Sequence, residues 1–260
     1  MASATGQANR IASMISAGQV KCTKWAKVLG TASTSGRSRC VKVLKTRIKT
    51  TRTKGRRAQR LRRCGVNSAI WARTAGISGM LFGAEISGVS DSMLKDQRTV
   101  ISMAASAPAA GKSPLMTLWL QDCAGNKLDP AFAAHELPIL YYAKCCFEKW
   151  IPIDILESTV DHVKITLADS KNKWNAPSRC PIMSIERLGW MLLSSNLILT
   201  DTGMQLDLGC DSPAFVMQQV TEAVRRNIAR EVDTQYPTLE SRGKEPITSG
   251  FRKTLRSAKT

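Results

Sequence analysis

The first 84 residues of this 260-residue chain contain no aspartate or glutamate, although they hold 18 lysines and arginines. The rest of the chain is balanced, with 20 basic and 20 acidic residues, so the net charge of +18 lies entirely in the first third. An asymmetry of this kind predicts a polyanionic partner. Nucleic acid is the first candidate, and an anionic membrane surface is the second.

Metal-ligand patterns are missing as well. The eight cysteines form no Cys-x-x-Cys pair, and the two histidines, His135 and His162, lie at no metal-ligand spacing from a cysteine. We therefore expect neither a zinc site nor a cofactor.

Long apolar runs are missing too. The longest apolar run, residues 188–199, has 12 residues, whereas a membrane span needs about 20. The first 20 residues lack a continuous apolar core, so we expect neither a membrane span nor a secretory signal.

Complete catalytic motifs are also absent. Residues 109–113, AAGKS, resemble the end of a phosphate-binding loop, but Ser106 stands where that loop needs glycine. Asp201-Thr202-Gly203 is interpreted as a hairpin turn, because no second Asp-Thr-Gly copy is present. No catalytic residue is predicted. If the chain were a metal-dependent nuclease or another enzyme, the first carboxylates to test would be Asp129, Asp154 and Asp201.

A basic segment, KTRIKTTRTKGRRAQRLRRCG, spans residues 45–65. Apolar and small residues recur through it at steps of three and four, which predicts a helix with one narrow, weakly apolar face. That face comprises Leu44, Ile48, Thr51, Gly55, Ala58 and Leu61. Like charges on the other faces repel one another, and phosphates would relieve this repulsion. The predicted nucleic-acid-binding residues are Arg37, Arg39, Lys42, Lys45, Arg47, Lys49, Arg52, Lys54, Arg56, Arg57, Arg60, Arg62 and Arg63.

The remaining patterns predict a mainly α fold with a small β-hairpin near the C-terminus and a basic N-terminal arm or helix. Residues 11–30 favour a short amphipathic helix, residues 31–38 a loop, and residues 196–209 a strand–turn–strand hairpin. Pro138 should kink or divide the helix expected after Asp129-Pro130. The expected organisation is a flexible segment at 1–36, a basic helix or arm at 37–66, a helical core at 67–178, a hairpin plus helix at 179–237 and a basic tail at 238–260.

Several of these motifs together carry a family resemblance. They lie at residues 24–31, 70–98, 129–150 and 188–190, and include the element Leu81-Phe82-Gly83-Ala84-Glu85. In this order they resemble the region downstream of the polymerase domain in LINE-type (non-LTR) retrotransposon reverse transcriptases, above all dinoflagellate copies. The resemblance implies a thumb-like or linker-like region that holds template and primer beside the catalytic part of a reverse transcriptase. The family's Tyr/Phe-x-Asp-Asp catalytic turn is absent here, so the resemblance implies no polymerase chemistry in this chain.

Other interpretations stay open on the sequence alone. A nucleic-acid-binding protein of this kind would be nuclear or cytoplasmic. The N-terminus is also acid-poor, serine-rich and arginine-containing, which resembles a mitochondrial transit peptide. A third hypothesis is an interaction protein whose basic segment serves as a nuclear or organellar targeting signal.

Overall fold

The computed structural model describes residues 25–28, 31–34, 40–62, 64–107, 111–122, 125–169 and 178–237. In chain order its elements are β1 (Trp25–Val28), β2 (Thr31–Thr34), α2 (Lys42–Arg62), α3 (Ser68–Trp71), the π-helical segment η1 (Ala72–Ile77), α4 (Ser78–Leu81), α5 (Ala84–Ser87), α6 (Asp91–Ala105), α7 (Pro114–Gln121), α8 (Ala131–Phe147), α9 (Ile153–Asp169), α10 (Arg179–Arg187), β3 (Met191–Leu192), β4 (Leu197–Leu199), β5 (Gln205–Asp207) and α11 (Pro213–Gln235). The predicted fold class, mainly α with a small β structure near the C-terminus, is confirmed.

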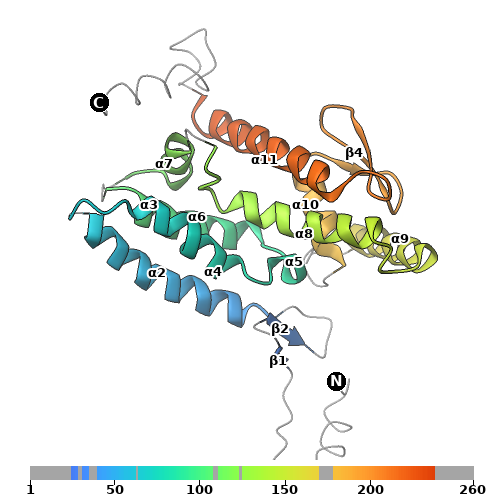
Figure 1. Ribbon diagram of the computed structural model, residues 1–260, viewed down its shortest axis with the longest axis horizontal. Coiled ribbons are helices and arrows are strands. Elements are labelled where there is room, and N and C mark those ends of the chain that lie inside the picture. The colour runs from blue at the N-terminus through green and yellow to red at the C-terminus, as the bar shows by residue number, and fades with distance from the viewer. Residues whose placement is uncertain are drawn as a thin grey trace, which may run out of the picture.

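The long helices form rows across the molecule (Figure 1). Helix α2 lies along α6 at one edge, α8 occupies the middle, and α11 packs against α8 at the opposite edge. Helices α9 and α10 lie beyond α5 at one end. The apolar core runs between these rows and includes the fully buried side chains of Met80, Ile101, Phe132 and Ile139. This arrangement leaves one long face of α2 free of the core.

Helix α8 is enclosed by its neighbours, which explains its nearly continuous apolar sequence. Residues from Ala131 to Cys146 on several faces of the helix are buried, and the helix continues through Pro138 as one element. Pro138 therefore does not divide the helix, which was one of the two predicted outcomes. None of the described helices is long and apolar enough to cross a membrane.

The predicted C-terminal hairpin is present. Strands β4 and β5 pair in antiparallel fashion, with Ile198 opposite Leu206, and the turn between them contains Gly203 at φ +83°. A left-handed backbone of this kind favours glycine. Ile198 is the fully buried residue of β4. Strand β3, which was not predicted, pairs with β4 and adds a third strand to the hairpin.

The N-terminal predictions need a correction. Residues 25–28 and 31–34, expected as part of a helix and of a loop, form the antiparallel hairpin β1–β2 with Trp25 opposite Thr34. The β-branched residues Val28, Thr31 and Thr34 suit strands, but four residues are too few to separate a strand from a loop by sequence. Most of the predicted flexible segment and the whole basic tail, 238–260, lie outside the described residues.

Candidate nucleic-acid interface

Helix α2 is the predicted basic helix, and it uses the predicted face to pack on the core. Its buried residues are Leu44, Ile48, Thr51, Gly55 and Ala58. Leu61, the sixth predicted member, is instead 54% exposed. Each residue of an α-helix turns by about 100°, so two successive steps of three residues place Leu61 about 100° from the centre of the buried face.

Gly55 explains how α2 approaches α6 so closely. A Cβ atom at this position would lie 3.3 Å from the Cβ of Ala104 and 3.6 Å from the Cζ3 atom of Trp71. Glycine inside a helix costs about 1 kcal/mol relative to alanine, and here the close contact between the two helices accounts for its presence. The burial of this one narrow face leaves most of the remaining residues of α2 exposed to solvent.

The cations of α2 are concentrated on one flank. At about 100° per residue, six of them fall within an arc of about 80°, centred about 120° from the buried face. These six define the cationic stripe: Lys42, Lys45, Lys49, Arg52, Arg56 and Arg60. All six are exposed. Lys54 and Arg57 are exposed on the other flank of the helix.

Two predicted binding residues have a different role. A guanidinium NH of Arg47 donates a hydrogen bond to the carbonyl of Phe82, and the guanidinium lies 5.0 Å from the centre of the Phe82 ring. Arg62 donates to the carbonyl of Ala105 over 2.6 Å. Both arginines therefore attach α2 to the body of the protein. Arg37, Arg39 and Arg63 lie outside the described residues.

The stripe carries closely spaced like charges. Within the described part of the chain, Lys45, Lys49, Arg52, Arg56 and Arg60 form no ion pair. Cations four residues apart on a helix destabilise it by about 0.2–0.5 kcal/mol per pair. The stripe contains three such pairs, and a polyanion bound along it would remove their repulsion.

Asp129 belongs to a buried ion-pair network that links three helices. Arg98 of α6 donates from Nε to both carboxylate oxygens of Asp129 (2.9 and 3.0 Å) and from a terminal nitrogen to Glu231 of α11 (2.8 Å). Burial raises the pKa of the Asp129 carboxyl, and the charge of Arg98 opposes that shift. Asp129 also accepts a hydrogen bond from the backbone NH of Ala131 at the start of α8. These contacts assign it a structural role.

Asp201 joins the hairpin turn to α11. Its carboxylate accepts hydrogen bonds from Trp190 Nε1 (2.9 Å) and from two nitrogens of Arg226 (2.7 and 2.9 Å). The hydrogen bonds from Arg226 are the main cause that lowers the pKa of Asp201. The predicted turn is thus confirmed. Its aspartate is hydrogen-bonded to Trp190 and Arg226, two partners that the local sequence did not predict.

Asp154, the third carboxylate considered, is exposed near the start of α9. Within the described residues, no group of three or more His, Cys, Asp or Glu side chains is arranged to hold a metal ion. The three carboxylates are therefore not brought together, and two of them bind arginines.

His135 is a buried histidine in α8, with a side chain only 2% exposed. Burial, assisted by the charges of Arg187 and Arg98, lowers its pKa to about 3. Its Nδ1 atom has no hydrogen-bond partner among the described residues. The imidazole is consequently neutral at physiological pH.

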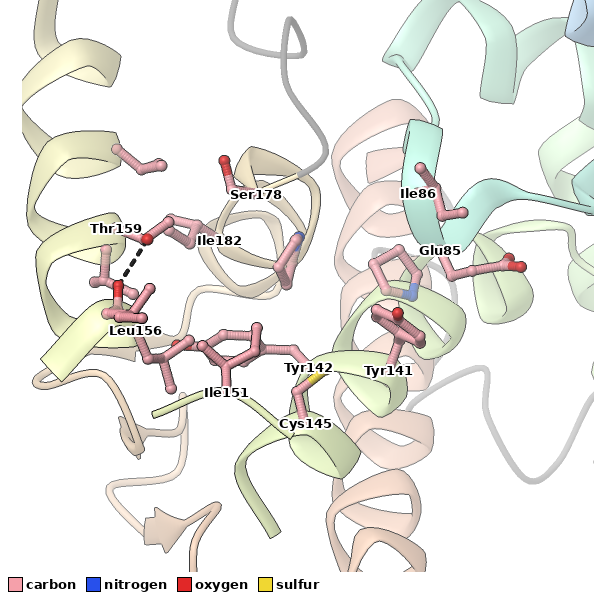
Figure 2. A pocket seen from close by; sticks show the side chains of 15 residues that line it. Glu85, Ile86, Tyr141, Tyr142, Cys145, Ile151, Leu156, Thr159, Ser178 and Ile182 are labelled. Carbon is pink, nitrogen blue, oxygen red and sulfur yellow. Dashed lines mark hydrogen bonds between the residues drawn. The ribbon is translucent and has the colours of Figure 1, made fainter. Parts of the chain in front are cut away.

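An apolar groove lies between α5, α8, α9 and α10 (Figure 2). Its volume is about 360 Å³, and we call it the α8–α9 groove. Representative wall residues are Ile86, Tyr141, Ile155 and Ile182, with Glu85 as the acidic residue on the α5 side. The sequence did not predict this groove, because its walls come from helices that are far apart along the chain.

Comparison with known proteins gives no relative for this arrangement. No protein-family model, curated protein or solved structure matches the chain. The resemblance to retrotransposon reverse transcriptases stays a prediction from the sequence motifs.

Proposed function

We propose that this protein binds the phosphate backbone of RNA or DNA along the cationic stripe of α2. The observation that carries the proposal is the alignment of six exposed cations on one flank of a helix whose opposite side is fixed to the core. Phosphate contacts of this kind give affinity and strong salt dependence but little base specificity.

The dimensions of the stripe suit a linear polyanion. Lys42 and Arg60 are 18 residues apart, which corresponds to about 27 Å along the helix axis. Successive cations are separated by three or four residues, or about 4.5–6 Å. Arginine occupies three of the six positions, and its planar guanidinium can form two parallel hydrogen bonds with one phosphate.

In the role that the motif resemblance implies, the protein is a non-catalytic, thumb-like or linker-like part of a retroelement reverse transcriptase. Its stripe would hold the template–primer while a separate catalytic part performs polymerisation. Such a role needs sequence-independent binding of the nucleic-acid backbone, and a row of lysines and arginines can provide it through phosphate contacts.

Two variants of equal net charge test the proposal. The stripe variant replaces Lys45, Lys49, Arg52, Arg56 and Arg60 with glutamine. The control variant replaces five cations elsewhere with glutamine: Arg73, Lys95, Lys144, Lys149 and Lys164, all exposed. Binding of labelled RNA and DNA duplexes is measured by fluorescence anisotropy at low salt. We expect the stripe variant to lose most of its affinity and the control to retain it. Equal loss in both variants would show that only the total charge matters, and the proposal would fail.

A further inference from the structure

The α8–α9 groove is an apolar surface whose described walls are partly exposed to solvent. Four of its lining residues are large and apolar yet substantially exposed: Ile86 (42%), Tyr141 (47%), Ile151 (40%) and Ile155 (52%). Trp150, itself 49% exposed, packs edge-on against Tyr141 with ring centres 5.7 Å apart. Contiguous exposed apolar surface of this kind marks a docking site in soluble proteins.

We propose that the groove binds the chain's own N-terminal segment through Ile11, Met14 and Ile15. These residues lie outside the described part of the structure, and Met14 and Ile15 follow Ile11 by three and four positions, a spacing that predicts one shared face of an amphipathic helix. An amphipathic helix that inserts such a face into an apolar groove is a common mode of peptide recognition. The inference is independent of nucleic-acid binding by α2.

The path of the chain places this segment beside the groove. Thr31 of β2 lies so close to Gly83 that a Cβ atom on Gly83 would come within 2.5 Å of the Thr31 Cγ2 atom. Gly83 immediately precedes α5, whose Glu85 and Ile86 form one wall of the groove. The hairpin β1–β2 is thus anchored next to that wall, as Figure 1 also shows.

The connecting residues are long enough to reach it. Trp25 pairs with Thr34, so it lies about 10 Å along the hairpin from Thr31. Glu85 and Ile86 follow Gly83 by two and three residues, so their Cα atoms lie at most about 7 and 11 Å from that of Gly83. Ile15 precedes Trp25 by ten residues, which span up to about 33–36 Å when extended. The segment can therefore enter the groove of the same molecule.

Charge also favours this occupant. Glu85 lies on the wall of the groove nearest the hairpin and forms no ion pair within the described part of the chain. The first 24 residues contain the cations Arg10, Lys21 and Lys24 and no acid. In Figure 2 the Glu85 carboxylate points away from the other labelled groove residues, so its negative charge lies at the edge of the α5 wall, where it attracts and does not repel an acid-free segment.

The test is a photo-cross-linking experiment on the full chain. Met14 is replaced by the photoreactive amino acid p-benzoylphenylalanine, the protein is irradiated, and the cross-linked peptides are identified by mass spectrometry. We expect intramolecular cross-links to groove residues such as Tyr141, Ile155 and Ile182. Cross-links confined to α2 or α11, cross-links between two copies of the chain, or no cross-links would each overturn the proposal.

Two isoleucines of α9 supply a matched pair of variants. Ile155, which lines the groove, and Ile165, which does not, are 52% and 67% exposed. In the cross-linking protein, Ile155→Asp should lower the yield about tenfold, equivalent to about 1.4 kcal/mol of binding, and Ile165→Asp should leave it unchanged. Equal effects would contradict docking in the groove. If circular dichroism shows that Ile155→Asp reduces the helical content, Ile86→Ser on the opposite wall replaces it as the deciding variant.

Discussion

At the residue scale, the buried imidazole of His135 couples folding to pH. Its pKa is lowered to about 3 in the folded protein, whereas an unfolded histidine has a pKa of about 6.5. Below pH 6.5 the unfolded chain binds a proton that the folded chain does not. The contribution of His135 to the free energy of unfolding is therefore fully present above pH 6.5 and decreases as the pH falls toward 3.

We predict that the free energy of unfolding decreases between pH 6 and pH 4.5 with a slope approaching 1.4 kcal/mol per pH unit, the value for about one proton. The His135→Gln variant should lose most of this slope. Urea titrations at several pH values measure it. His162→Gln is the control, because His162 is exposed on α9, and its profile should follow that of the unmodified protein. An unchanged slope in His135→Gln would refute the assignment.

Arg98 contributes to the stability of the fold, because its side chain neutralises the buried carboxylate of Asp129. Arg98→Met should lower the free energy of unfolding by about 3–5 kcal/mol, since it leaves a buried carboxylate without a cation. Replacing Asp129 with leucine in the same protein should recover much of that loss. Arg225→Ala breaks an exposed pair with Glu222 and should cost no more than about 1 kcal/mol. Denaturant unfolding of the three variants measures these differences, and similar losses for Arg98→Met and Arg225→Ala would contradict the network.

At the element scale, the contact between α2 and α6 depends on the absence of a side chain at Gly55. We predict that Gly55→Leu lowers the free energy of unfolding by about 1–3 kcal/mol, because the new side chain overlaps Ala104 and Trp71. Gly79 in α4 provides the opposite case, since a Cβ atom there meets nothing within 4 Å. Gly79→Ala should stabilise the protein by about 0.5–1 kcal/mol through helix propensity alone. Thermal and urea unfolding measure both, and stabilisation by Gly55→Leu would show that the two helices are not in close contact.

The helices and strands differ in how well the sequence predicts them. Helix α2, its buried face and helix α11 were predictable, because their apolar residues recur with a local helical period. The hairpin β4–β5 was predictable from its turn residues. Strand β3 has only two residues, and its pairing with β4 is a tertiary contact that no local pattern encodes.

Candidate binding surfaces were predictable only where they lie within one element. The cationic stripe follows from the sequence of α2 and the geometry of a helix. The α8–α9 groove and the partners of Asp129 and Asp201 required the structure, because residues such as Arg98 and Glu231 are separated by 133 positions. Sequence patterns predict which residues share a helix face, but tertiary packing decides which helices meet.

At the scale of the whole molecule, the proposed function depends on where the positive charge lies. Ten of the twelve described lysines and arginines of the acid-free region lie on α2, which occupies the edge of the protein opposite α11 (Figure 1). The remainder of the chain, from Glu85 onward, is neutral overall. A field concentrated at one edge accelerates the association of an oppositely charged partner and orients it there.

The measurement that tests this account most directly is the salt dependence of nucleic-acid binding by the intact protein and the two charge variants. The logarithm of the affinity for a DNA duplex is determined against the logarithm of salt concentration. Each phosphate contact contributes about −0.9 to the slope, so the stripe variant, which lacks five cations, should have a slope shallower by about 4.5. The control variant should keep the slope of the intact protein. No binding by the intact protein at low salt, or the same slope for all three proteins, would contradict the central claim.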